Sequence, residues 1–251
     1  MSGKVYLVGA GPGAPDLLTL RAARLLGEAD VVLHDALVHP GTLALAARAE
    51  KIPVGKRCGR HSSAQRFINK RLVDAARRHR VVVRLKGGDP MLFGRAQEEI
   101  AALEAAGIEY EVVPGVTAAL AAAADLGVSL TQRGSARSVA FVTPRVAEGE
   151  AASEWARTAA SADTAVIYMG AGDAARVRTA LIEAGVEGGM PVALVESASL
   201  ENSRSIRGTL AELEALATAR GEGPVVIVIG RVVAAASETL PMEAIGSAIA
   251  A

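Results

Sequence analysis

Short apolar, β-branched runs alternate with amphipathic, alanine-rich stretches along the first half of the chain. Three of the runs are apolar along most of their length: VYLVG (5–9), VVVRLK (81–86) and YEVVP (110–114). Strands of this kind are typical of a parallel sheet that helices cover on both faces. The stretches 16–29 and 63–79 have apolar residues at helical spacing, and Ser63 is the expected cap of the second. With shorter strands at 31–33 and 51–55, this alternation predicts an α/β fold.

A polar stretch, SLTQRGSAR (129–137), interrupts this alternation. Beyond it lie further strand candidates separated by helical stretches: SVAFVTP (138–144), TAVIYMG (164–170), PVALVES (191–197), NSRSIRGTL (202–210) and PVVIVIG (224–230). We therefore expect two α/β domains, residues 1–133 and 134–251, with a weakly patterned tail from about residue 234.

The charge balance and the single cysteine exclude several classes of protein. Lys plus Arg and Asp plus Glu both number 27 in the 251 residues, whereas proteins that bind duplex nucleic acid are usually basic. Cys58 alone excludes a disulfide or a cysteine-based zinc site within one chain, and we predict no metal. The longest apolar window, VTAALAAAA (116–124), is too short to span a membrane. We expect a soluble, cytoplasmic protein with no nucleic-acid or membrane partner.

Glycine, proline and charged residues cluster where the predicted strands end. In open α/β sheets, ligands bind beyond the carboxyl ends of the strands. We therefore expect the functional site to be built from these loops: GAGPGAPD (9–16), HD (34–35), GKR (55–57), KGGDP (86–90), PGVT (114–117) and YMG (168–170).

The first loop, GAGPGA (9–14), matches the dinucleotide fingerprint, and Asp35 has about the spacing of a ribose-binding acid. However, Pro12 and Pro15 remove two backbone N–H groups from the segment that would cradle a pyrophosphate. An NAD-dependent oxidoreductase is therefore one alternative of a different class, and a simple strand-to-helix turn is another.

The loop KGGDP (86–90) is not a phosphate-binding loop, because it lacks the Walker pattern and its Asp89 would repel a phosphate. Its glycines allow a ligand to approach the backbone closely, and an acid favours an amine or a ribose hydroxyl. S-adenosylmethionine carries both groups and no phosphate. The alternative is that Asp89 only caps its own turn.

Several of these motifs together resemble the tetrapyrrole methylase family, and within it the members that methylate uroporphyrinogen III. The resemblance extends from about residue 4 to about residue 233. It rests on these segments: VYLVGAGPGAPDLLTLRAARLL, DALV, GKRCGRHSSAQRFIN, VVVRLKGGDPMLFGR, GIEYEVVPGVTAA, LTQR and MPVALVE.

The resemblance implies two α/β domains with the active site in the cleft between them, and a homodimer. It implies methyl transfer from S-adenosyl-L-methionine to two pyrrole carbons of uroporphyrinogen III, which gives precorrin-2 for sirohaem or cobalamin biosynthesis and leaves S-adenosyl-L-homocysteine. An alternative within the same class is a methylase of another corrinoid precursor. A non-catalytic sensor of an adenosyl ligand is a further alternative.

Carried over by position, the resemblance also implies roles for individual residues. Asp35 matches the proposed proton acceptor and Lys56 the proposed proton donor. The macrocycle would contact Arg95, Glu98 and Arg133. The cofactor would contact Pro12, Gly87, Gly88, Asp89, Leu92, Thr117, Ala118, Met169 and Ala198.

Local positive charge fits a substrate that carries many carboxylates, since the arginine fork binds a carboxylate through two bonds. Candidate cations lie on predicted loops or loop edges: Arg57, Arg60, Lys86, Arg95, Arg133 and Arg137. The chain departs from the usual family pattern at His34, Ala96-Gln97, Gln132, TPR (143–145) and Ala198. These departures affect fine specificity rather than the choice of cofactor.

Overall fold

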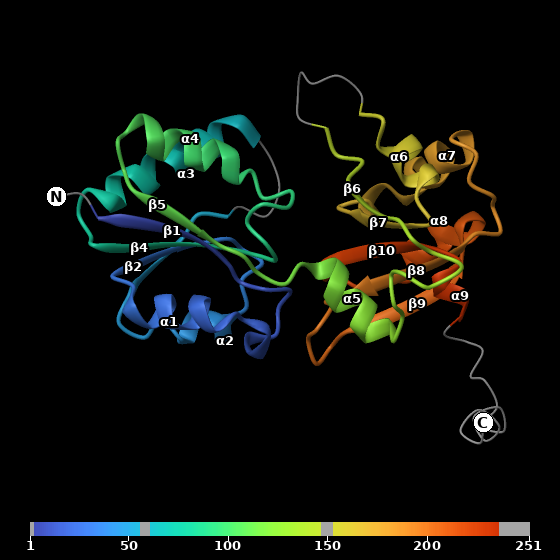
Figure 1. Ribbon diagram of the computed structural model, residues 1–251, viewed down its shortest axis with the longest axis horizontal. Helices are drawn as coiled ribbons and strands as arrows, with labels where there is room; N and C mark the ends of the chain where they lie inside the picture. Colours follow the sequence, from blue (N-terminus) through green and yellow to red (C-terminus); the bar gives the residue numbers. More distant parts are fainter. Residues whose placement is uncertain (1–2, 56–60, 147–152, 236–251) are drawn as a thin grey trace. The chain divides into compact units, whose positions relative to one another are not determined.

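The computed structural model describes residues 3–55, 61–146 and 153–235 (Figure 1). The chain forms two compact units, each with a β-sheet and helices, so the predicted α/β class is confirmed. The first unit contains the residues up to Ala121 together with Ser197–Asn202. The second contains Ala122–Glu196 and the residues from Ser203 on. The division that the sequence suggested, at residues 133 and 134, stays a prediction, and most of the predicted tail lies outside the described residues.

The first unit contains a five-stranded sheet in which every neighbouring pair of strands is parallel, as predicted. The strand order is β3 (Glu50–Pro53), β2 (Val31–His34), β4 (Val81–Lys86), β1 (Lys4–Gly9) and β5 (Tyr110–Val113). Gly9 at the end of β1 pairs with Lys86 at the end of β4. The loops after these central strands therefore leave the sheet at the same level.

Helices cover both faces of this sheet (Figure 1). The helices α1 (Leu20–Glu28) and α2 (Pro40–Ala44) lie on one face, and α3 (His61–Ala76) and α4 (Ala96–Ala105) on the other. Leu25 and Leu26 pack on one set of alternate strand residues, whereas Leu72 and Leu103 pack on the other set. This double burial explains why the strands are almost continuously apolar.

Two predicted helix starts were wrong. The stretch 16–29 is not one helix, because Pro15 begins a short 3₁₀ helix, η1 (Pro15–Leu17), and α1 starts only at Leu20. Thr19 caps α1, since its side-chain oxygen accepts a hydrogen bond from the N–H of Ala22. The helix α3 begins at His61, which places Ser63 inside the first turn rather than at the cap.

The second unit contains a mixed five-stranded sheet whose strands were all predicted from sequence. Their order is β6 (Val139–Val142), β7 (Thr164–Tyr168), β10 (Val225–Gly230), β8 (Pro191–Glu196) and β9 (Arg204–Thr209). Only β6 and β7 are parallel; the other neighbouring pairs are antiparallel. The helical elements here are α6 (Trp155–Ser161), η2 (Ala171–Asp173), α7 (Ala174–Glu183), η3 (Leu210–Glu212), α8 (Leu213–Thr218) and α9 (Val232–Ala235).

The helix α5 (Ala118–Leu126) follows β5 and contains the last residues of the first unit and the first of the second. Arg207 of β9 donates hydrogen bonds to the carbonyl of Leu126 at the end of α5 and to that of Val233 in α9, both at 2.7 Å. In the part of the chain that the structure describes, no helix has the length and apolar character needed to cross a bilayer.

Acid should weaken the second unit through Glu196. Both carboxylate oxygens of Glu196 accept backbone hydrogen bonds, from Gly221 and Gly223, and these bonds lower the pKa of Glu196 below its ordinary 4.5. A lowered pKa in the folded state gives stability that is present above the ordinary value and is lost as the pH falls below about 4.5. We expect Glu196→Gln to have a smaller free energy of unfolding than the wild type at neutral pH. Its free energy of unfolding should also decrease less as the pH falls below about 4.5. Urea unfolding at a series of pH values measures both effects. Parallel pH curves for the two proteins would contradict this assignment.

Candidate functional site

Three glycines bring the loops after β1, β4 and β5 into direct backbone contact. A Cβ atom on Gly9 would lie 2.6 Å from Gly115 and 2.7 Å from the carbonyl oxygen of Gly88, and a Cβ on Gly115 would lie 2.4 Å from that same oxygen. Real Cβ atoms do not approach backbone atoms so closely, so only glycine fits at these positions. Gly11 and Gly88 also exchange hydrogen bonds of 3.2 and 2.7 Å between their backbones. The three loops therefore form one rigid junction at the carboxyl ends of the strands.

The geometry of the first loop does not support the dinucleotide interpretation. The N–H of Gly11 is bonded to Gly88, and the N–H of Ala14 donates to Oγ of Ser199 at 3.1 Å. Pro12 and Pro15 have no N–H, and the nearest α-helix begins several residues later, at Leu20. At positions 11, 12, 14 and 15 a pyrophosphate would therefore find no free N–H, and no α-helix begins next to this loop.

Asp89 holds the junction together through its carboxylate. Its Oδ1 accepts a hydrogen bond from the N–H of Met91 at 2.8 Å, and its Oδ2 accepts one from the N–H of Gly115 at 2.9 Å. The first bond closes the turn of the KGGDP loop, and the second ties that loop to the loop after β5. This is the capping role that the sequence left open, and contact between Asp89 and a cofactor stays a prediction.

Asp89→Ala should therefore weaken the fold as well as any ligand contact. It leaves the N–H groups of Met91 and Gly115 without their acceptor, at an expected cost of about 1–3 kcal/mol. Urea unfolding of the variant measures this loss. Asp16→Ala is the matched control, because Asp16 is exposed on the neighbouring loop. Equal stability of the two variants would show that the Asp89 bonds do not hold the junction.

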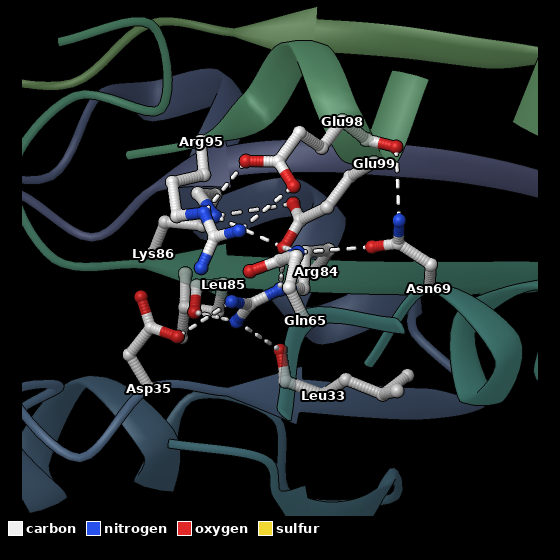
Figure 2. A network of polar contacts seen from close by, with 10 residues as sticks. All are labelled: Leu33, Asp35, Gln65, Asn69, Arg84, Leu85, Lys86, Arg95, Glu98 and Glu99. Carbon is white, nitrogen blue, oxygen red and sulfur yellow. Dashed lines mark hydrogen bonds and ion pairs between the residues drawn. The ribbon is translucent and has the colours of Figure 1, made fainter. Parts of the chain in front are cut away.

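A network of charged side chains joins the strand β4 to the helix α4 and to Asp35 (Figure 2). Arg84 and Lys86 of β4 and Glu99 of α4 are each at most 3% exposed. Arg84 Nε lies 3.0 Å from Glu99 Oε1, and Lys86 Nζ lies 3.1 Å from both oxygens of Glu99. On its other side, Arg84 Nη2 donates to Oδ1 of Asp35 at 2.6 Å. Two buried cations are thus balanced by the buried carboxylate of Glu99 and the partly exposed carboxylate of Asp35.

Burial and neighbouring charges shape the ionisation of this network. Burial lowers the pKa of the Lys86 ammonium, and the positive charge of Arg84 lowers it further, against the attraction of Glu99. Burial also acts to lower the pKa of Arg84, but the carboxylates of Asp35 and Glu99 outweigh it and the pKa is raised. Arg84 therefore stays a cation and holds the Asp35 carboxylate in place.

Arg95 and Glu98, two residues predicted to contact the macrocycle, bind each other at the start of α4. Nε and Nη2 of Arg95 lie 2.6 and 2.8 Å from the two oxygens of Glu98, in a paired arrangement. Both side chains are largely exposed. Arg95 and the nearby Phe93 have backbone φ angles of 54° and 53°, a left-handed conformation that costs energy in non-glycine residues. The loop therefore presents the Arg95 guanidinium at the protein surface, directly before the helix that contains Glu99.

The structure brings many of the predicted site residues together in the first unit. Gly87, Gly88 and Leu92 follow β4, and Thr117 and Ala118 follow β5. Pro12 lies in the first loop, and Ala198 is buried in the segment that packs on it. Met169, with φ of 57°, and the exposed Arg133 belong to the second unit. Lys56, Arg57 and Arg60 lie outside the described residues.

Lys86 lies at the end of β4, the loop edge where it was predicted, but it is buried and paired with Glu99. Its inclusion among the cations available to a substrate carboxylate was therefore wrong. Sequence reasoning also missed Arg84, Glu99 and Gln65, whose amide nitrogen lies 3.4 Å from Glu99. A signal was present in VVVRLK, because two cations within a strand that is otherwise buried require anions nearby.

Among the residues that the structure describes, no group of histidine, cysteine or acidic side chains has an arrangement that could hold a metal ion.

Comparison with known proteins identifies the family to which the chain belongs. Residues 4–214 match the family of tetrapyrrole (corrin/porphyrin) methylases. The native form of uroporphyrin III C-methyl transferase from Thermus thermophilus has a TM-score of 0.82 and 43% sequence identity, over 93% of this chain and 100% of that one. Its complex with S-adenyl homocysteine has a TM-score of 0.79 and 42% identity, over the same shares of the two chains.

A longer relative has a different name. The siroheme synthase of Chromobacterium violaceum is 48% identical over 234 residues, which are 92% of this chain and 50% of that protein. The chain therefore spans about half the length of the curated relatives it matches.

Proposed function

Because the chain belongs to the family of tetrapyrrole (corrin/porphyrin) methylases, we propose that it transfers methyl groups from S-adenosylmethionine to carbon atoms of uroporphyrinogen III. Two transfers would give precorrin-2. The observation that carries this proposal is the close match to the uroporphyrin III C-methyl transferase of Thermus thermophilus, over the full length of that chain. Production of sirohaem, the activity named for the longer relatives, is a proposal for the pathway and not for this chain alone.

The glycine junction fits the proposed cofactor. Gly87 and Gly88 expose backbone without side chains. Half-buried Leu92 lies on the same loop, Thr117 on the loop after β5, and half-buried Ala118 begins α5. The loops offer a carboxylate, Asp89, and the first loop has no free N–H at positions 11, 12, 14 and 15, which favours an uncharged ribose and an amine over a phosphate. These residues would hold the cofactor, which when bound supplies a methyl group that is open to attack by a nucleophilic carbon.

Asp35 is suited to accept a proton from the macrocycle. Its Oδ1 is fixed by Arg84, its side chain is 31% exposed, and its Oδ2 has no hydrogen-bond partner among the residues that the structure describes. A carboxylate held in this way presents one oxygen to a ligand in a defined direction. Loss of a ring proton makes a pyrrole carbon more nucleophilic, so a fixed carboxylate beside the ring assists the reaction.

Arg95 would bind a carboxylate of the macrocycle, because its guanidinium is exposed and preorganised by Glu98. Arg133 is also exposed and would supply a second such contact. Lys56 remains the proposed proton donor. In this account the protein contributes mainly by positioning the reactants, which suits a displacement that requires carbon, methyl and sulfur in line.

Anaerobic incubation with uroporphyrinogen III and S-adenosylmethionine, followed by mass spectrometry of the macrocycle, tests the proposal. We expect a product that has gained two methyl groups. An unchanged macrocycle, with cofactor binding verified by calorimetry, would exclude uroporphyrinogen III as the acceptor and favour a different corrinoid precursor or a sensor. Thermal protection by NAD and none by S-adenosylhomocysteine would instead support the oxidoreductase alternative.

The resemblance also leads us to propose a homodimer. Light scattering after size-exclusion chromatography measures its mass directly. We expect twice the mass of one 25.6 kDa chain.

A further inference from the structure

We propose that Glu99 is a positioning residue that orients both Asp35 and Arg95, although it touches neither the cofactor nor the macrocycle. This inference rests on the proposed function for the roles of Asp35 and Arg95, and on the buried network for the role of Glu99. Glu99 is 0% exposed and lies in the first turn of α4. A carboxylate that is fully removed from water needs several donors, and the donors that Glu99 has come from two other elements.

The first consequence concerns Arg84. The guanidinium of Arg84 is held through Nε by Glu99 at 3.0 Å and through Nη1 by the carbonyl of Leu85 at 3.2 Å. These contacts fix the plane of the fork, so its remaining nitrogen, Nη2, points at Oδ1 of Asp35 (Figure 2). Without the Nε contact, the fork could rotate about its side-chain bonds, and Asp35 would lose its defined direction.

The second consequence concerns the start of α4. Lys86 Nζ contacts both oxygens of Glu99, which fastens the first turn of α4 to the end of β4. On the side of α3, Gln65 contacts Glu99, and Asn69 donates to the carbonyl of Glu98 at 3.0 Å. Glu98 in turn holds the Arg95 fork. The buried carboxylate of Glu99, together with the bond from Asn69, thus fastens the turn that presents Arg95.

The need to fix Arg84 explains why the buried positions 86 and 99 carry a lysine and a glutamate rather than two apolar residues. An apolar pair of similar volume is often as stable as a buried ion pair, so stability alone does not require Lys86 and Glu99. An apolar pair would leave the Nε of Arg84 without an acceptor, and Arg84 would no longer be fixed beside Asp35. We therefore infer that the network orients Arg84 and, through it, Asp35. The experiment must measure this orientation separately from stability.

Two double variants separate orientation from stability. Lys86→Met with Glu99→Gln removes both charges and keeps an oxygen that accepts from Arg84 Nε. Lys86→Met with Glu99→Met also removes both charges, has nearly the same volume and lacks that oxygen. We expect the second variant to turn over at least about tenfold more slowly than the first, because misplacement of catalytic groups by a fraction of an ångström to one ångström has effects of this size. We expect the two double variants to bind S-adenosylhomocysteine with affinities that agree within about twofold, since neither changes the glycine junction that would bind it.

Crystal structures of the two variants give a readout that does not depend on activity. We expect Arg84 to stay on Asp35 in the glutamine variant and to leave it in the methionine variant. An Asp35–Arg84 pair that is unchanged in both structures would overturn the inference. So would equal turnover of both variants with normal cofactor affinity. Failure of the proposed function looks different, because the wild-type chain would then not methylate uroporphyrinogen III, while the structural comparison would still decide the role of Glu99.

If the methionine variant does not fold, Glu99→Asp replaces it. The side chain is shorter by one methylene group and keeps its charge, so it can approach Lys86 or Arg84 but not both at hydrogen-bond distance. We expect slower turnover with unchanged cofactor affinity and a displaced Arg84 in the crystal. Wild-type turnover and an unmoved Arg84 would overturn the inference.

Discussion

Gly115→Ala is expected to destabilise the protein by about 3 kcal/mol and to abolish binding of S-adenosylhomocysteine. The added methyl group would lie 2.4 Å from the carbonyl oxygen of Gly88 and 2.8 Å from Cα of Gly9. Both neighbours are backbone atoms of packed loops, so neither can move without breaking the junction. Urea unfolding measures the stability, and calorimetry with S-adenosylhomocysteine measures the binding.

Gly27→Ala is the matched control, because it makes the same chemical change within α1, where a Cβ atom would meet nothing within 4 Å. We expect it to raise stability by about 0.5–1 kcal/mol, since alanine is the better helix former. Binding should be unchanged. If Gly115→Ala behaved like this control, the close approach of the three loops would not be a property of the folded protein.

Glu99→Gln alone is expected to cost about 3–5 kcal/mol, because it leaves Arg84 and Lys86 buried without their shared anion. Adding Lys86→Met to it should recover most of this loss, since the double variant removes the charges as a pair. Urea unfolding of the wild type, the two single variants and the double variant gives the coupling energy between Lys86 and Glu99.

Glu28→Gln is the control for the loss of an acid from an ion pair. Glu28 pairs with Arg24 on the exposed side of α1, with the two side chains 50% and 60% exposed. We expect it to change stability by less than about 0.5 kcal/mol. A similarly small effect of Glu99→Gln would mean that water reaches Glu99 in solution and that the network is not buried.

The strands were the part of the fold that the sequence predicted well. Runs such as VYLVG and PVVIVIG are buried on both faces, so their apolar character is independent of which residue faces which layer. For the same reason, the apolar pattern does not reveal strand direction. β10 is antiparallel to both of its neighbours, yet its sequence has the same apolar pattern as that of β1, which lies in a parallel sheet. Direction depends on how the connections run, which residue periodicity does not record.

The candidate site was predicted in outline but not in its internal contacts. The loops after β1, β4 and β5 were found because glycine, proline and acids mark the carboxyl ends of parallel strands. The partner of Asp35 was not found, because Arg84 lies 49 residues away along the chain and on a different strand. Likewise, the contact between Asp89 and Gly115 depends on the close approach of two loops, which no local pattern encodes.

The most direct test of the account uses S-adenosylmethionine with a trideuterated methyl group. The protein, uroporphyrinogen III and this donor are incubated without oxygen, and the macrocycle is analysed by mass spectrometry and carbon NMR. We expect two trideuterated methyl groups, each bonded to a ring carbon, and their loss in Asp35→Asn with cofactor affinity retained. A macrocycle that carries no label, while the protein binds S-adenosylhomocysteine, would contradict it.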